Sequence, residues 1–287
     1  MILLPSQGKR ITLGNDWNLF FVDKFRIALA QLEPKLFDKE HNLTKAEWAI
    51  RQAAENGAQV ILFPELYLTG YRLAERAVEF AETLNGPTVS AATKLAADHQ
   101  IAVIMGYAEL APGGQQAYDT VFITDATGQV VGNYRKIHLF HAEKEWFIPG
   151  DQPLVVDFGL GKTGFLICYD LEFPEAAREL ALRGAQWIAT STGNMLPNQH
   201  LQQIFVQSRA LENHLWVAVA NRTGREADIE FFGGSAVADP TGNLVAQAND
   251  KETLLYVDID LASAVEARLN ADYLTDCRMD LYWNRKV

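Results

Sequence analysis

The sequence predicts an α/β protein, specifically a four-layer α-β-β-α sandwich in which two mixed sheets pack face to face with helices outside. Strand and helix patterns alternate in each half of the 287-residue chain, which is typical of βα units with parallel strands. Each half then adds a hairpin, which introduces antiparallel pairing. Because no repeat or linker-like stretch divides the chain, we expect a single domain over residues 25–287, preceded by an N-terminal arm over residues 1–24.

The first half starts with alternating strand and helix signals. The expected elements are a strand at residues 25–31, a helix ending near Gly57, a strand at 60–63, a helix at 89–96, a strand at 101–106 and a hairpin formed by 119–124 and 129–134. The strands are short apolar runs, and the first helix is indicated by Leu43, Ala46 and Ile50 at three-and-four spacing. Gly128 supplies the turn of the hairpin.

The second half has the same order of elements. It contains an expected strand at residues 164–168, a helix at 174–183, a strand at 187–191, a helix at 199–213, a strand at 215–220, a hairpin at 234–246 and a last strand at 254–259. The turn of this hairpin is the segment Asp239-Pro240-Thr241-Gly242. The inner face of the long helix is predicted to carry Leu201, Ile204, Phe205, Ser208 and Leu211.

Composition limits the classes of partner. With 48% hydrophobic and 21% charged residues the chain can bury a core, and its net charge of −11 offers no basic face to nucleic acid or anionic membranes. No apolar run is long enough to cross a bilayer, and the N-terminus lacks the pattern of a signal peptide. The only two cysteines, Cys168 and Cys277, are too few for a disulfide framework. We therefore expect a cytoplasmic protein.

Three residues suited to catalysis each follow the end of a predicted strand. Glu65 comes after residues 60–63, Lys136 after the hairpin strand, and Cys168 at the end of residues 164–168. Each has a simpler interpretation alone, namely a solvated glutamate, a surface lysine or a packed, inert thiol. Strand ends meet at one edge of a sheet, however, and a cysteine nucleophile needs both a base and a cation beside the developing negative charge. The combination favours an active site.

Metal and cofactor chemistry find no support in the sequence. His138, His141 and His200 do not have the spacing of a zinc site, and the glycine-bearing loops match no phosphate-binding pattern. We expect no metal and no cofactor.

Three segments that contain these residues resemble the nitrilase, or carbon-nitrogen hydrolase, superfamily. They are Phe63-Pro64-Glu65 with its continuation to Tyr71, Tyr134-Arg135-Lys136-Ile137-His138-Leu139, and Cys168-Tyr169-Asp170-Leu171-Glu172-Phe173-Pro174-Glu175, in the order and spacing of the family. Further similar pieces lie at residues 209–213, 220–224, 234–235 and 239–242. The resemblance extends from Phe25 to about Trp283.

The resemblance implies a role for each matching residue. Glu65 would be the general base, Cys168 the nucleophile, and Lys136 the cation that stabilises the tetrahedral intermediate, with the backbone N–H of Tyr169 completing the oxyanion site. A second glutamate is expected ahead of the Phe-x-Pro-Gly turn, either Glu143, which its distance from Gly150 favours, or Glu145. Candidate substrate-binding residues are Tyr118, Trp146, Tyr169, Asn194 and Met195. Many relatives carry Arg at the position of Glu172, so the charge of the pocket can differ here.

The function expected from the resemblance is hydrolysis of a small linear carboxamide to an acid and ammonia through a cysteine thioester. N-carbamoyl amides or nitriles are alternative substrates for the same three residues, and a catalytically idle binding or scaffold protein is the alternative from another class. Retention of Glu65, Lys136 and Cys168 together argues against a scaffold. The resemblance also implies a homodimer or larger homo-oligomer, for which Tyr273-Leu274 and Leu281-Tyr282-Trp283 offer apolar anchors.

Overall fold

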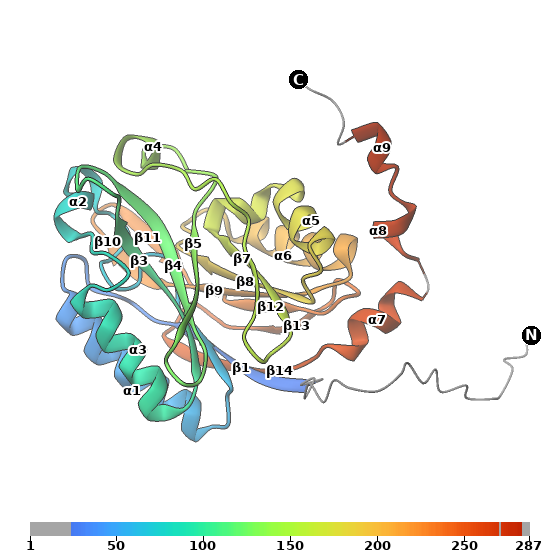
Figure 1. The fold of residues 1–287 in the computed structure, drawn as a ribbon, viewed down its shortest axis with the longest axis horizontal. Coiled ribbons are helices and arrows are strands. Elements are labelled where there is room, and N and C mark those ends of the chain that lie inside the picture. The colour runs from blue at the N-terminus through green and yellow to red at the C-terminus, as the bar shows by residue number, and fades with distance from the viewer. Residues whose placement is uncertain (1–23, 270, 283–287) are drawn as a thin grey trace, which may run out of the picture.

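The predicted sandwich is confirmed by the computed structural model, which describes residues 24–269 and 271–282 (Figure 1). One six-stranded sheet contains, in spatial order, β14 (Thr253–Asp260), β1 (Lys24–Gln31), β2 (Val60–Leu62), β3 (Ala102–Leu110), β4 (Ala117–Thr124) and β5 (Val130–Arg135). The other contains β13 (Leu244–Gln247), β12 (Ala236–Ala238), β9 (Trp216–Asn221), β8 (Trp187–Thr192), β7 (Lys162–Ile167) and β6 (Val155–Asp157). Both sheets are mixed, as the sequence predicts.

The parallel core of each sheet comes from the βα units and the antiparallel strands from the hairpins. Strands β1, β2 and β3 are parallel to one another, as are β7, β8 and β9. β14 returns from the end of the second half and pairs antiparallel with β1 over its whole length, from Lys24 opposite Asp260 to Gln31 opposite Thr253. The chain therefore closes the first sheet with a strand from the second half.

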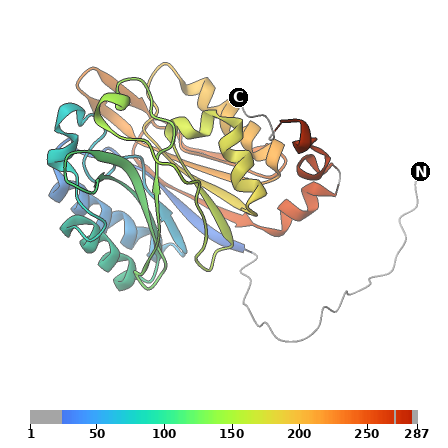
Figure 2. The same ribbon diagram turned by 45° about the horizontal axis from the view of Figure 1, so that its top comes forward.

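Helices cover the outer face of each sheet. α1 (Lys39–Glu55) and α3 (Pro87–His99) lie on the first sheet, and α5 (Pro174–Leu182) and α6 (Gln199–Asn213) on the second (Figure 2). Asp38 caps α1 by accepting a hydrogen bond from the backbone N–H of His41 at 3.1 Å, and proline opens both α3 and α5. These local signals explain where the helices begin. α5 begins at Pro174, as predicted, and α3 begins two residues before the predicted start.

The largest apolar core lies between the two sheets. Alternate residues of each strand supply it, for example Ile27 and Leu62 from the first sheet and Phe165 and Trp187 from the second. The intervening residues, such as Ile61, pack against the outer helices instead. Because side chains alternate between the faces of a strand, a strand buried on both faces must be apolar throughout, and the central strands have this character.

The predicted inner face of α6 is wrong. Ile204 is 53% exposed and Leu211 43% exposed, whereas Gln202, Val206, Arg209 and Ala210 are buried. The polar members of the buried face are used for hydrogen bonding: the Arg209 guanidinium donates to the carbonyls of Leu171 and Glu172 at 3.0 and 2.9 Å. The predicted stripe is therefore largely outside the core: Ile204 and Leu211 are exposed, and of the apolar members only Phe205 packs against the core beneath the helix.

Several short elements are additional to the prediction. They are the helices η1 (Ala74–Arg76), α2 (Ala77–Phe80), α4 (Glu143–Trp146), η2 (Cys168–Glu172), α7 (Ala262–Arg268), α8 (Tyr273–Asp276) and α9 (Met279–Tyr282), the edge strand β6, and the small hairpin of β10 (Thr223–Glu226) and β11 (Ile229–Phe232). Elements of three to seven residues are too short to show a period.

The expected N-terminal arm lies outside the described residues except for Lys24. Within the described ranges, none of the helices has the length and apolar character needed to cross a bilayer.

Candidate active site

Glu65, Lys136 and Glu143 meet in one buried cluster. The Nζ atom of Lys136 lies 2.5 Å from Oε1 of Glu65 and 2.7 Å from Oε2 of Glu143. Glu65 and Lys136 have no exposed side-chain surface, and Glu143 is also buried. We refer to Glu65, Lys136, Glu143 and the adjacent Asp119 as the carboxylate–lysine cluster. Glu145 is exposed, so it is Glu143 that the structure brings to the lysine.

Backbone contacts between neighbouring strands hold the cluster in place. Phe63, directly after β2, donates to the carbonyl of Ile104 at 2.8 Å, which extends the sheet to the residues around Glu65. Lys136 continues β5 in the same way, because its N–H donates to the carbonyl of Asp119 at 2.8 Å. A Cβ atom on Gly106 would come within 2.5 Å of the backbone nitrogen of Leu66, so the turn after β2 requires glycine at that position.

Cys168 stands in a tight turn directly after β7. Its φ angle is 45°, a left-handed conformation that is unfavourable for a residue with a Cβ and is often found at functional sites. The buried carboxylate of Asp170 holds the turn by accepting hydrogen bonds from the N–H of Ile167 at 3.1 Å, the hydroxyl of Tyr134 at 2.8 Å and the N–H of His138 at 2.8 Å. The turn that carries Cys168 is thereby tied to the segment that carries Lys136.

Asn194 contacts the thiol. The Sγ atom of Cys168 donates to Oδ1 of Asn194 at 3.3 Å, and Nδ2 of Asn194 donates to Oε1 of Gln202 at 2.8 Å. Gln202 in turn donates through Nε2 to the carbonyl of Gly234 at 2.8 Å, so the orientation of both amides is determined by a backbone acceptor. Asn194 therefore presents its oxygen to the thiol, and α6 supports it with the polar face described above.

Two residues of this site were not predicted from the sequence: Asp119, which belongs to the cluster, and Tyr71, which contacts it. Asp119 is wholly buried, and its Oδ2 atom lies 3.6 Å from Nζ of Lys136. Tyr71 donates its hydroxyl to Oε1 of Glu143 at 2.6 Å, while the N–H of Phe140 donates to the other oxygen at 2.8 Å. The available signals were weak: Asp119 is one acidic residue within a strand, and Tyr71 is one aromatic residue of the first motif.

Burial determines the charges in the cluster. It raises the pKa of Glu65, an effect that the charge of Lys136 opposes, and burial together with Glu65 raises the pKa of the Cys168 thiol well above its ordinary value. Burial lowers the pKa of Lys136, but the charges of Glu65 and Glu143 outweigh it and raise that pKa well above its ordinary value. The resting site therefore holds a protonated thiol and a charged lysine.

The cluster has the residue types of a cation site. Carboxyl oxygens of Glu65, Asp119 and Glu143 lie within 4.8 Å of one another, an arrangement that can bind a divalent metal ion. The position among them is taken by the ammonium of Lys136, at 2.5, 3.6 and 2.7 Å. The lysine thus supplies the cation of this cluster.

The remaining substrate-binding candidates divide into two groups. Tyr169, next to Cys168, packs edge-on against Phe140 with 5.1 Å between the ring centroids, and Met195 follows Asn194. Tyr118 stacks on the guanidinium of Arg135 at 4.0 Å, on the face of β4 opposite Asp119. Trp146 lines a surface hollow with Val78 and Gln116. The structure thus places Tyr169 next to Cys168 and Asn194 against its thiol, with Met195 next to Asn194 in the chain, whereas Tyr118 and Trp146 make their contacts elsewhere.

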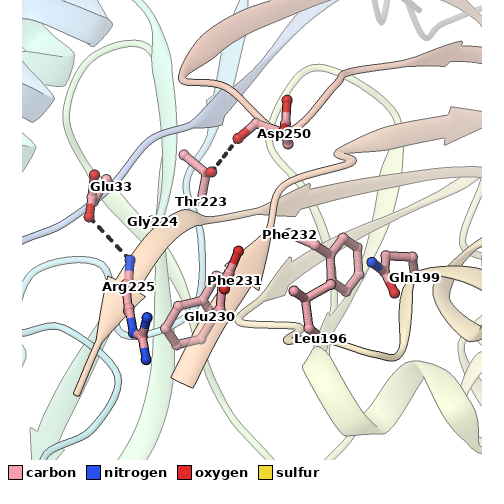
Figure 3. Close-up of a pocket in the computed structure, with 10 residues that line it drawn as sticks. All are labelled: Glu33, Leu196, Gln199, Thr223, Gly224, Arg225, Glu230, Phe231, Phe232 and Asp250. Atoms are coloured by element: carbon pink, nitrogen blue, oxygen red, sulfur yellow. Dashed lines mark hydrogen bonds between the residues drawn. The ribbon is translucent and has the colours of Figure 1, made fainter. Parts of the chain in front are cut away.

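Met195 forms a backbone bridge with Phe231 of the β10–β11 hairpin. Phe231 in turn lines a hollow of about 690 Å³ (Figure 3). Its wall includes Leu196, Phe231 and Phe232, together with Arg225 and Glu230. None of the residues of the carboxylate–lysine cluster lines it. The hollow is a neighbour of the candidate site rather than its interior.

The fold and the buried cluster define the class of protein. The model of the carbon-nitrogen hydrolase family matches residues 26–269, and the chain belongs to this enzyme family, within the nitrilase superfamily.

Individual relatives agree with this assignment. A hydrolase encoded in the pqqF 5′ region of Pseudomonas protegens is 37% identical over 264 residues, covering 91% of this chain and 92% of that protein. An (R)-stereoselective amidase of a Pseudomonas species is 34% identical over 257 residues, covering 89% of this chain and 92% of that protein. A solved mutant structure of the Nesterenkonia AN1 amidase has a TM-score of 0.83 and 33% identity, covering 91% of this chain and 96% of that chain. The chain thus lies in the amidase-like branch.

Proposed function

We propose that the protein hydrolyses the C–N bond of a small linear carboxamide, giving a carboxylic acid and ammonia through a thioester on Cys168. The observation that carries the proposal is the buried contact of 2.5 Å between Lys136 and Glu65, whose charges both act on the thiol of Cys168. A base and a cation are the two groups that a thiol nucleophile requires. The amidases among the relatives support an amide substrate.

The first half of the proposed reaction forms the thioester. Sγ of Cys168 attacks the carbonyl carbon as Glu65 accepts the thiol proton, and the carbonyl oxygen becomes an oxyanion. Lys136 and the backbone N–H of Tyr169 stabilise this oxyanion. When the C–N bond breaks, Glu65 returns the proton to nitrogen and ammonia leaves. The raised pKa of Glu65 suits a group that must both accept and donate a proton near neutral pH.

The second half releases the acid. Glu65 removes a proton from water, the resulting oxygen nucleophile attacks the thioester carbonyl, and the C–S bond breaks to release the carboxylic acid while the proton returns to sulfur. Glu143 positions the cation: it contacts Lys136 and is itself held by Tyr71 and by the N–H of Phe140. Asn194, Met195 and Tyr169 are the proposed substrate contacts.

Two other assignments remain as outcomes of the test. An N-carbamoyl amide or a nitrile would use the same three residues. A binding or scaffold protein would have no use for buried ionisable groups, which lose their solvation and destabilise a fold unless they are well paired. The intact cluster therefore favours an enzyme.

The test is a panel of small carboxamides, N-carbamoyl amino acids and nitriles, assayed for ammonia release. We expect linear carboxamides to give the highest kcat/KM. A solved structure of a glutamate-to-glutamine mutant of the Nesterenkonia amidase carries the acetamide moiety of fluoroacetamide on its active-site cysteine. Fluoroacetamide should likewise add one acetamide group to Cys168, seen by intact mass and peptide mapping. No turnover across the panel and no adduct would contradict the proposal.

We also propose that the protein is at least a homodimer. The predicted stripe of α6 exposes Ile204 and Leu211, and the C-terminal helices expose Tyr273, Leu281 and Tyr282, while Trp283 lies outside the described residues. Such apolar surface is typical of an interface. Light scattering at micromolar concentration should give at least twice the chain mass, and Ile204→Glu should lower it. A parent protein that scatters as a monomer would contradict the prediction.

Two further expectations enter the proposal. We propose that residues 25–287 form one domain, because the core between the sheets takes residues from both halves of the chain. Both cysteines are free thiols, which supports a reducing compartment such as the cytoplasm.

A further inference from the structure

Asp119 is a third acidic neighbour of Lys136 that the proposed reaction does not use. Its side chain is wholly buried, and neither carboxyl oxygen has a hydrogen-bond partner in the described part of the chain. Oε2 of Glu65 is also without a partner. A buried carboxylate without donors is strongly unfavourable, whereas a neutral carboxylic acid is much less so. The local geometry therefore favours a neutral carboxylic acid at one of these two positions.

A count of the charges indicates that at least one of the three carboxyl groups beside Lys136 holds a proton. Glu65, Asp119 and Glu143 would contribute three negative charges against the single positive charge of Lys136, and all four side chains are buried. Glu143 has a hydroxyl, a backbone N–H and the lysine as donors, so it is well stabilised as an anion. Glu65 has the shortest contact to the lysine. Asp119 has the longest, at 3.6 Å, and no other donor.

The surrounding charges act in the same direction. The titratable groups that face Asp119 are Glu65 after β2, Lys136 after β5 and Glu143 in α4, with Cys168 and Tyr71 in the same pocket. Burial and the charge of Glu65 raise the pKa of Asp119 well above its ordinary value, Glu143 adds to this, and Lys136 opposes it. The favoured distribution therefore leaves Glu65 and Glu143 ionised and Asp119 protonated.

We propose that Asp119 is a positioning residue that stays a neutral carboxylic acid in the working enzyme and thereby keeps Glu65 ionised as the base. Ionised Asp119 would place a second uncompensated charge beside Glu65, and Glu65 would then take up the proton and lose its basic function. A hydrogen bond that protonated Asp119 donates to Glu65 would, like the charge of Lys136, lower the pKa of Glu65 and so oppose the effect of burial. The inference deepens the proposed function, because it depends on Glu65 being the base.

The decisive measurement is the pH dependence of thermal unfolding for the parent and Asp119→Asn, whose side chain is neutral at every pH. In the unfolded chain Asp119 loses its proton above a pH of about 4, but the folded parent keeps it. Rising pH therefore destabilises the parent relative to the variant, by roughly 2 to 3 °C in Tm per pH unit for one retained proton. The difference should grow from pH 5 to 8.

If Asp119 is ionised in the folded protein, the stability difference between parent and variant should change with pH in the opposite direction. If Asp119 is an anion paired with Lys136, the parent gains stability over the variant as pH rises through about 4 and keeps it; that result, or a difference independent of pH, overturns the inference. Asp258→Asn is the matched control. Asp258 is exposed and pairs with Arg26, which holds its pKa below the ordinary value, so it is ionised in both the folded and the unfolded chain above about pH 5, and the Tm difference between the parent and this variant should stay constant from pH 5 to 8. If Asp119→Asn does not fold, Asp119→Ser gives the same comparison.

The pH dependence of kcat/KM distinguishes this positioning role from a purely structural one, which would leave the profile unchanged. The alkaline limb of kcat/KM against pH should lie at higher pH in Asp119→Asn than in the parent, because the variant has no proton to lose at this position. Coincident pH profiles would contradict the role beside Glu65. The Tm comparison requires no turnover, so it stands even if the parent releases no ammonia from any amide, an outcome that would count against the proposed function alone.

Discussion

Replacing Cys168 with alanine is expected to abolish ammonia release and adduct formation with fluoroacetamide, because no other thiol lies in the turn after β7. The loss should reach the detection limit of the assay, since removing a nucleophile leaves only binding and oxyanion stabilisation. Folding should survive, because the turn is held by the carboxylate of Asp170 rather than by the sulfur. Thermal unfolding and circular dichroism would check this beside the kinetics.

Cys277 provides the matched control. It is a free thiol between α8 and α9, remote in sequence from each motif, and Cys277→Ala should keep most of the parental kcat/KM. A dead Cys277→Ala with an active Cys168→Ala would reverse the assignment of the nucleophile and with it the proposed mechanism.

Replacing Lys136 with methionine is expected to lower kcat/KM about a hundredfold or more, the scale seen when one oxyanion donor is removed. Methionine keeps much of the volume but leaves Glu65, Glu143 and Asp119 without a cation. These carboxyls then hold protons more tightly, so Glu65 is neutral at the working pH and cannot accept the thiol proton. Iodoacetamide should accordingly alkylate Cys168 more slowly than in the parent protein.

The same substitution should also destabilise the fold. Breaking a buried ion pair on one side typically lowers stability by about 3 to 5 kcal/mol, and protonation of the carboxyls relieves part of it. Lys144→Met is the control. Lys144 is exposed in α4, the short helix that begins with Glu143, so this substitution should leave both rate and stability near those of the parent. Parental activity and parental alkylation in Lys136→Met would show that the lysine has no part in catalysis.

The alternation of elements and the residues after strand ends were determined by the sequence alone. Apolar runs predict central strands because such strands are buried on both faces, and the positions of Glu65, Lys136 and Cys168 follow from where those runs stop. Both signals are local in the chain, since a strand end and a tight turn depend on a few consecutive residues. The structure accordingly has β5 and β7 ending directly before Lys136 and Cys168, and β2 ending three residues before Glu65.

Other features depended on residues far apart in the sequence, and only the tertiary structure decided them. β14 pairs with β1 across more than 220 positions, which no local pattern encodes. The buried face of α6 is polar because Arg209 and Gln202 support the turn and the asparagine beside Cys168, a requirement set by neighbouring elements rather than by the period of the helix. Asp119 and Tyr118 are adjacent in β4, yet side chains alternate across a strand, so one joins the lysine and the other stacks on Arg135. The register of β4 in the sheet determines which of these two side chains points toward the cluster, because that pairing determines which side of the strand lies against the second sheet.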